Sequence, residues 1–458
     1  MFTKLKNVLT MPRDKAFSGK LFRLALPMML EQFLMSSLFI FDTVFVGALG
    51  DEYLGAVGQA GNLIMLLWCG FFALSSAGTI FSAQYWGKDK DEMGIRKCFT
   101  VSMMFSILIS VIFFVVSFFF RGAVMSVMSQ DASVRLIGAQ YLSIVSFAYP
   151  VWAVMSVLAA MMRSMGITKK PMIASVIAAA FNIIFDGLFV GGTFGLPKLG
   201  VPAAAISTVV GAVIEIVLLI VFARRSNSPI TARRRDLVWP GKEMVKRYLK
   251  TALPLAAKDQ LWAGGVAVYS VSFAALGVAA TAAYNVYGTL VRFMDVLMLA
   301  LGNAGGILIG HELGAAEIER AKNYAWRLLR VVFVSCVALG PVFILLRGPM
   351  LLPYPNLTPE AIGYARDALL LGSLIIWARG VNYTNMNGIL RAGGDTFGAA
   401  AIDIGVLWLL GVPLTVIAGM LLHLPFTTVV LMTCLEEVVK VGVSILRVRK
   451  YKWAKQLV

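Results

Sequence analysis

Two acidic residues, a carboxamide and a hydroxyl stand in the first half of the chain, within segments that are otherwise apolar. Asp42 lies in FIFDTVFVGALG, and Asn182 and Asp186 lie one helical turn apart in FNIIFD, so a helix would place them on one face. Thr208 follows in AAAISTVVG. Carboxylate, amide and hydroxyl oxygens suit a proton or an alkali cation better than a transition metal. These four residues predict a cation-coupling site, with no metal beyond sodium and no other cofactor.

The apolar surroundings of the two carboxylates favour a functional role. A charged side chain at the centre of a spanning helix costs roughly 2.5–3.5 kcal/mol. An apolar environment disfavours the charged form of a carboxylate, and a second carboxylate nearby disfavours it further. Asp42 and Asp186 are therefore expected to bind and release ions as a unit. A purely structural alternative, in which Asn182 and Thr208 only hydrogen-bond neighbouring helices, stays open.

Other polar residues in apolar segments are candidates for a substrate cavity. Glu31 precedes Asp42 by about three helical turns and falls on nearly the same face. For Lys258 and Asp259 an internal ion pair is an equal alternative, and pairing is the default for Asp295 with Arg292. Arg379, Asp403, Glu436, Glu437 and Lys440 are likewise expected to neutralise one another. The residues assigned to the cavity are Glu31, Gln32, Lys258, Asp259 and Asp295.

The elements that position these residues are predicted to be membrane-spanning helices. The 458 residues are 59% hydrophobic and only 14% charged, whereas soluble domains carry roughly a quarter charged residues. Apolar stretches of about 20 residues, the length that spans a bilayer, recur along the chain. The fold class is therefore all-α integral membrane, with twelve transmembrane helices. They are expected near residues 21–49, 57–86, 98–120, 135–162, 172–191, 199–223, 251–275, 283–312, 324–346, 363–388, 397–420 and 425–446.

The basic residues predict the orientation of these helices. The formal net charge of +17 arises from Lys and Arg that concentrate in alternate loops, which argues against a nucleic-acid partner. Because positive loops stay in the cytoplasm, both termini are expected there. The protein is thus expected to be a multi-pass protein of a bacterial or archaeal plasma (inner) membrane.

The two halves of the chain repeat one another. An offset of 227 residues aligns Ala25-Leu26-Pro27 with Ala252-Leu253-Pro254, and Ala48-Leu49-Gly50 with Ala275-Leu276-Gly277. We expect two pseudo-symmetric six-helix bundles, 1–223 and 251–458, joined by a basic cytoplasmic linker, 224–250. Parallel repeats of this kind build transporters with a substrate path between the bundles. Asp42 aligns with Tyr269, so the acidic cluster belongs to the first half alone.

Motifs of several enzyme classes are missing from the sequence. It has no GxxxxGK[ST] loop for ATP, and His311 and His423 lack the HExxH spacing of zinc proteases. An intramembrane aspartyl protease using Asp42 and Asp186 is a remote alternative, because the Tyr-Asp and Gly-x-Gly-Asp settings of such enzymes are missing. The chain is therefore not expected to be an enzyme.

Several segments together resemble the multidrug and toxic compound extrusion (MATE) family. They are LALPMMLEQFLMSSLFIFDTVFVGALG, YWGKDKDEMGIRK, RSMGITKKPM, NIIFD and ILRAGGDT, and the likeness runs through nearly the whole chain. Within the family the chain looks most like the DinF-type branch, because Asp42, Asn182, Asp186 and Thr208 match its first-bundle site. Lys258 and Asp259 depart from other branches, which use a single acidic residue there.

The resemblance implies a function. It implies a secondary antiporter, acting as a monomer in the lipid bilayer, that exports hydrophobic, often cationic drugs in exchange for protons or sodium by alternating access. Drug resistance would be its physiological effect. The alternative is a flippase for lipid-linked sugars or other lipids, which a basic cavity would favour.

Overall fold

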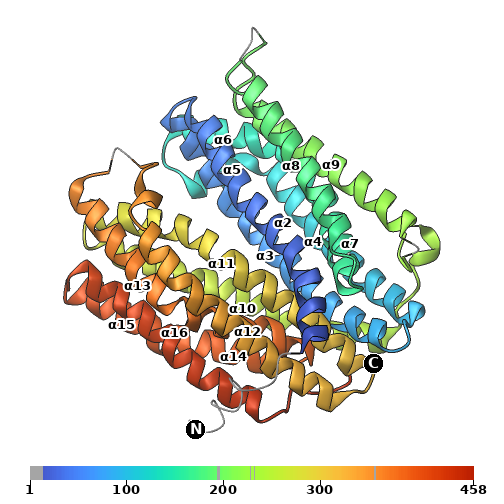
Figure 1. Cartoon of the computed structure of the whole chain (residues 1–458). Coiled ribbons are helices and arrows are strands. Elements are labelled where there is room, and N and C mark those ends of the chain that lie inside the picture. The colour runs from blue at the N-terminus through green and yellow to red at the C-terminus, as the bar shows by residue number, and fades with distance from the viewer. Residues whose placement is uncertain (1–13, 193–195, 227, 232, 355–356) are drawn as a thin grey trace. The chain divides into compact units, whose positions relative to one another are not determined.

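The computed structural model describes residues 14–458 apart from 193–195, 227, 232 and 355–356, and it also leaves out the side chains of Phe39 and Asp51. The described residues form helices and connecting turns, without a β-strand (Figure 1). Contacts divide the chain into two compact units. The N-terminal unit comprises Leu30–Ala252, and the C-terminal unit comprises Leu253–Val458 together with the described residues up to Met29.

The described residues of the first half contain six spans, one of them made of two helices. Short polar residues begin some of these helices: Asp91 accepts a hydrogen bond from Gly94 N at 2.9 Å, and Asp131 accepts one from Ser133 N at 2.8 Å. The helices are α2 (Lys15–Gly47), α3 (Asp51–Gly87), α4 (Glu92–Phe119), α5 (Arg121–Met128), α6 (Ala132–Val145), α7 (Ala148–Ser164), α8 (Lys169–Phe189) and α9 (Val201–Arg225).

The second half contains three π-helical segments that continue its α-helices. Such segments occur often at functional sites. The elements are η2 (Arg234–Asp236), α10 (Lys242–Ala274), α11 (Val278–Gly314), α12 (Ile318–Leu346), η3 (Pro349–Leu351), α13 (Pro359–Tyr383), η4 (Thr384–Leu390), α14 (Thr396–Val406), η5 (Leu407–Gly411), α15 (Val412–Val416), η6 (Ile417–Leu421) and α16 (Phe426–Arg449); η4, η5 and η6 are the π-helical ones.

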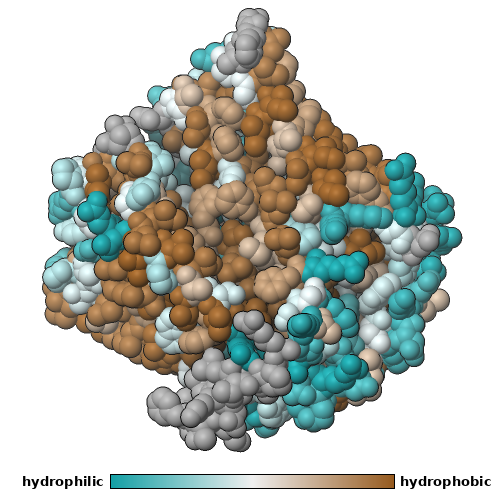
Figure 2. Space-filling view, in the orientation of Figure 1, coloured by the Kyte–Doolittle hydropathy of each residue, from teal (hydrophilic) through white to brown (hydrophobic). Residues whose placement is uncertain are grey.

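The predicted twelve-helix membrane fold is confirmed. Among the described residues nine helical segments are long and apolar enough to cross a membrane, and the bent pair α6 and α7 makes a tenth. The other two spans are α10 and α16, whose hydropathy is lowered by charged residues such as Lys258 and Lys440. Figure 2 shows the apolar surface that such spans expose: over α9 it is brown along the helix and teal at the end that leads to the linker.

Two predicted boundaries differ from the structure. The span predicted as one helix over 135–162 is broken between α6 and α7, with a bend of 52°. Pro150 explains the break, because it has no N–H to bond to the carbonyl of Ser146, and its ring crowds that carbonyl. In addition, α10 begins at Lys242, so the end of the predicted linker 224–250 is helical.

The predicted repeat has counterparts in the geometry of the chain. Helices α2 and α10 each have 33 residues, and α3 and α11 each have 37. The turns that follow α2 and α10 each contain a glycine in a conformation that other residues rarely adopt, Gly50 with φ 130° and Gly277 with φ 111°. At the next aligned turn, Asp89 and Ala316 both have positive φ, 49° and 61°.

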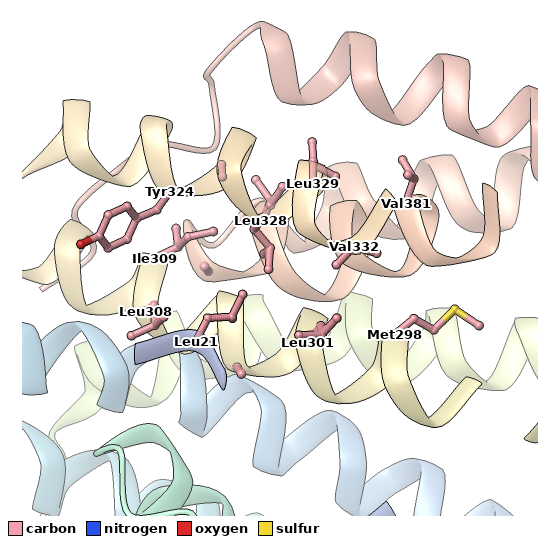
Figure 3. Packing of buried hydrophobic residues seen from close by; sticks show 14 of the residues in the cluster. Leu21, Met298, Leu301, Leu308, Ile309, Tyr324, Leu328, Leu329, Val332 and Val381 are labelled. Carbon is pink, nitrogen blue, oxygen red and sulfur yellow. The ribbon is translucent and has the colours of Figure 1, made fainter. Parts of the chain in front are cut away.

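The core of the C-terminal unit includes the beginning of α2. Leu21 packs with Leu301 and Leu308 of α11 and with side chains of α12 such as Leu328 (Figure 3). Phe17 packs against Tyr324 with ring centroids 4.6 Å apart and ring planes tilted by 48°. Each predicted domain is a continuous stretch of sequence, with the boundaries 1–223, 224–250 and 251–458. The contacts, in contrast, assign the start of α2 to the C-terminal unit.

Candidate functional site

Three helices of the N-terminal unit bring the predicted cation-coupling residues together. Asp42 lies near the end of α2, and Asn182 and Asp186 occupy successive turns on one face of α8. Helix α9 packs along α8 and carries Ser207 and Thr208. Asn182 and Asp186 are almost completely buried, with 6% and 1% of their surfaces exposed. The site therefore lies inside the helical bundle.

Asn182 links the three helices that form this site. When its carboxamide nitrogen faces the acidic residues, Nδ2 lies 3.1 Å from Asp42 Oδ1 and 3.3 Å from Asp186 Oδ2. The carboxamide oxygen then accepts a hydrogen bond from Ser207 Oγ at 3.0 Å. A single amide thus connects α2, α8 and α9, because its two N–H groups and its carbonyl oxygen each have a partner.

Thr208 forms a hydrogen bond within its own helix. Its hydroxyl donates to the carbonyl oxygen of Ala204 at 2.8 Å, one turn earlier in α9. The neighbouring Ser207 contacts Asn182 instead, and Tyr141 of α6 lies beside Thr208 within electrostatic range of both carboxylates. Sequence reasoning missed Ser207 and Tyr141. The only sequence signal for Ser207 was its position next to the predicted Thr208.

The two carboxylates have an unusual electrostatic environment. Neither Asp42 nor Asp186 pairs with a Lys or Arg among the described residues. Asp186 Oδ1 is buried and has no hydrogen-bond partner in the described part of the chain. The site therefore offers carboxylate oxygens that a proton or a bound cation would neutralise. No cluster of three or more His, Cys, Asp or Glu residues for a metal occurs in the described ranges.

Glu31 lies in a second polar cluster of the N-terminal unit. It pairs with Arg163 of α7 at 2.8 Å, about three turns of α2 away from Asp42. The buried Glu215 of α9 lies within electrostatic range of this pair and accepts a hydrogen bond from Ser175 Oγ at 2.6 Å. Glu215 was missed, although an acidic residue within VIEIVL is a plain signal. Gln32 is exposed and lies apart from the carboxylate site.

Lys258 and Asp259 belong to a chain of charges in the C-terminal unit. Lys258 Nζ lies 3.2 Å from Asp259 and 3.7 Å from Asp403, and it donates to Asn387 Oδ1 at 3.1 Å. Asp403 also pairs with the buried Lys440 at 2.9 Å. The internal ion pair considered for Lys258 and Asp259 is thus present, and it extends to α14, η4 and α16.

The same chain of charges continues along α16. Lys440 pairs with Glu436 at 2.7 Å, and Tyr269 donates to Glu436 at 2.6 Å. Asp295, assigned to the cavity, pairs with Arg379 at 2.9 Å. These acids therefore have cationic partners, unlike Asp42 and Asp186.

Comparison with known proteins places the chain among membrane transporters. The MatE family model matches residues 27–188 and 260–417. The probable multidrug resistance protein YoeA of Bacillus subtilis (strain 168) is 24% identical over 84% of each chain. The multidrug resistance protein MdtK of Pectobacterium atrosepticum is 26% identical over 86% of each chain.

Solved structures share the fold. A MOP superfamily transporter from Pyrococcus furiosus, described as having a binding pocket of reverse polarity, has a TM-score of 0.86 at 18% identity. The alignment covers 94% of this chain and 95% of that one. An outward-facing multidrug resistance MATE family transporter has a TM-score of 0.85 at 17% identity, with coverage of 94% and 96%.

Proposed function

The chain belongs to the MatE family, and from this premise we propose that it exports hydrophobic, often cationic compounds in exchange for protons or sodium ions. The names of its relatives support the export of drugs, since YoeA and MdtK are both described as multidrug resistance proteins. The coupling ion and the exchange itself are our proposals. The DinF-type branch remains a prediction from the sequence.

The observation that carries the proposal is the pair of uncompensated carboxylates. Asn182 joins Asp42 to Asp186, and no Lys or Arg of the described residues pairs with either acid. Burying such groups is unfavourable unless a proton or cation neutralises them. A bound ion would therefore change the energy of the contacts between α2 and α8, which is what a coupling site requires.

Helix α2 connects this site to the rest of the protein. Its residues up to Met29 belong to the C-terminal unit, and those from Leu30, including Asp42, belong to the N-terminal unit. We propose that ion uptake at Asp42 and Asp186 alters α2 and drives substrate release. Rocking of the bundles then returns the protein to its inward-facing form, as in alternating access by other repeat transporters.

The substrate path remains a proposal from the sequence. Lys258, Asp259, Asp295, Glu31 and Gln32 are proposed to line it, although ion pairs now engage four of these residues. A substrate would then have to compete with those pairs or contact their exposed sides. We also propose that the protein acts as a monomer in the plasma membrane, with both termini in the cytoplasm and no cofactor.

Efflux from proteoliposomes tests the proposal. Vesicles loaded with a lipophilic cationic dye should release it faster when a proton or a sodium gradient is imposed, and the gradient that works identifies the coupling ion. Asp42→Asn should abolish that acceleration. The matched control is Asp89→Asn, an exposed loop residue whose φ of 49° asparagine accepts readily.

Two outcomes would contradict the proposal. Retained gradient-driven efflux in Asp42→Asn would remove the site from the mechanism. If neither gradient drives efflux in the unmodified protein, a lipid flippase becomes the better hypothesis. The present charges favour export, because the cations Lys258 and Lys440 are already neutralised by acids and offer no free basic pocket.

A further inference from the structure

The segment 233–240, which leads into α10, has a defined fold. Asp236 is completely buried, and its Oδ2 accepts hydrogen bonds from Thr231 N at 2.7 Å, Thr231 Oγ1 at 3.0 Å and Arg233 N at 3.0 Å. These contacts close a short turn around one carboxylate. The segment is therefore a structured element and not a loose tether.

Contacts with helix α4 fix the position of this segment along the axis of that helix. Val238 N donates to Thr100 Oγ1 at 3.0 Å, and Arg96 Nε lies 3.8 Å from Asp236 Oδ1. Arg96 also donates to the carbonyl oxygen of Pro229 at 3.1 Å. The segment thus lies beside the second and third turns of α4.

The positions of the charged residues along α4 indicate how deep this part of the helix lies in the bilayer. No charged residue occurs between Lys97 and Arg121. At 1.5 Å per residue this stretch matches the hydrocarbon core, which is about 30 Å thick. Thr100 lies less than one turn beyond Lys97, so Val238 is held close to the boundary between headgroups and acyl chains.

The side chains that the segment exposes suit this boundary. Trp239 is 71% exposed and Leu237 is 54% exposed, although both are large and apolar. The three residues before Asp236, Arg233 to Arg235, are exposed as well. Tryptophan is enriched at membrane interfaces, and arginines near the surface attract anionic lipids.

We propose that segment 233–240 is a membrane-interface anchor that binds anionic phospholipid headgroups. The guanidinium groups of Arg233, Arg234 and Arg235 contact the lipid phosphates, and Leu237 and Trp239 enter the upper acyl region. The buried Asp236 and the contact with Thr100 fix both groups at the correct depth. The anchor depends on the membrane fold and not on the proposed transport activity.

Quenching by brominated lipids tests the anchor in the full-length protein. The emission of Trp239 is obtained as the difference between the unmodified protein and Trp239→Phe, both reconstituted in phosphatidylcholine nanodiscs. A small fraction of lipid brominated near the headgroup end of its acyl chains is added, either as phosphatidylglycerol or as phosphatidylcholine. The account predicts quenching of Trp239 by both lipids, and severalfold stronger quenching by phosphatidylglycerol, because three arginines near the surface attract anionic lipid.

Two charge-matched variants isolate the role of the arginines. The triple variant Arg233→Gln, Arg234→Gln, Arg235→Gln should lower quenching by phosphatidylglycerol to the phosphatidylcholine level. The triple variant Arg449→Gln, Lys450→Gln, Lys452→Gln removes the same charge from the C-terminal end and should keep the preference. Absence of quenching by either lipid would overturn the membrane location, and equal quenching in the unmodified protein would overturn the anionic specificity.

The contact with α4 gives a third variant. Thr100→Val keeps the size of the side chain and removes the acceptor for Val238 N. The segment should then no longer be held at its depth in the membrane, so quenching of Trp239 should fall for both lipids. Unchanged quenching in this variant would show that α4 does not set the depth of the anchor.

Discussion

At the scale of single residues, the carboxylate site and the chain of charges around Lys440 give their acids opposite kinds of partner. Asp42 and Asp186 share the Asn182 amide, whereas Asp403 has two lysine partners. An acid with fixed cationic partners has less need of a mobile ion. This difference is why we place ion coupling in the N-terminal unit.

Asn182→Leu should destabilise the protein by about 1–3 kcal/mol, because the buried carboxylate of Asp186 loses the amide that donates to it. Thermal unfolding in detergent would measure the loss. Asn62→Leu is the control, since Asn62 is exposed and donates to the nearby Gln59. Equal melting temperatures for the two variants would contradict the bridging role of Asn182.

Lys440→Met should cost about 3–5 kcal/mol, because it leaves Asp403 and Glu436 buried beside a neutral side chain. Adding Asp403→Asn should recover part of the loss. Lys322→Met serves as the control: Lys322 pairs with the exposed Glu319, so its loss should cost at most about 1 kcal/mol. Thermal unfolding of the three variants checks this ordering, and equal losses for the two lysines would contradict it.

At the scale of elements, the sequence predicted the spans better than their irregularities. Apolar length located the twelve helices, and the repeat aligned Gly50 with Gly277, which lie in corresponding turns of the structure. The break after α6 was missed, although Pro150 in SFAYPVW is a local signal for it. The π-helical segments were not predicted either, although Pro413 just after η5 is a local signal for one of them. The choice between Ser207 and Thr208 also depends on the rotation of α9, which spacing alone does not fix.

The close approach of η4 to α11 gives a prediction at this scale. A Cβ added to Gly388 would lie 2.9 Å from the carbonyl oxygen of Gly302, a backbone atom that cannot move aside cheaply. Gly388→Ala should therefore destabilise the protein by about 1–3 kcal/mol in a thermal unfolding experiment. Gly288→Ala, in the same α11 but with open space around it, should be neutral or stabilising. A neutral Gly388→Ala would show that this contact is loose.

At the scale of the whole molecule, α2 is one of two helices that the units share, the other being α10. The start of the helix contributes Phe17 and Leu21 to the core of the C-terminal unit, and its end contributes Asp42 to the carboxylate site. Sequence alignment of the halves could not reveal this, because it assigns all of α2 to the first repeat. The sharing gives the proposed coupling site a direct covalent connection to the other unit.

The most direct test of the central claim is ion release from the purified protein when substrate binds. If ion and substrate compete through Asp42 and Asp186, adding a lipophilic cation in weakly buffered or sodium-loaded detergent solution should release about one proton or sodium ion per protein. Asp42→Asn and Asp186→Asn should abolish the release, and Asp89→Asn should preserve it. Release of the same size from the two site variants would contradict the claim that these carboxylates hold the coupling ion.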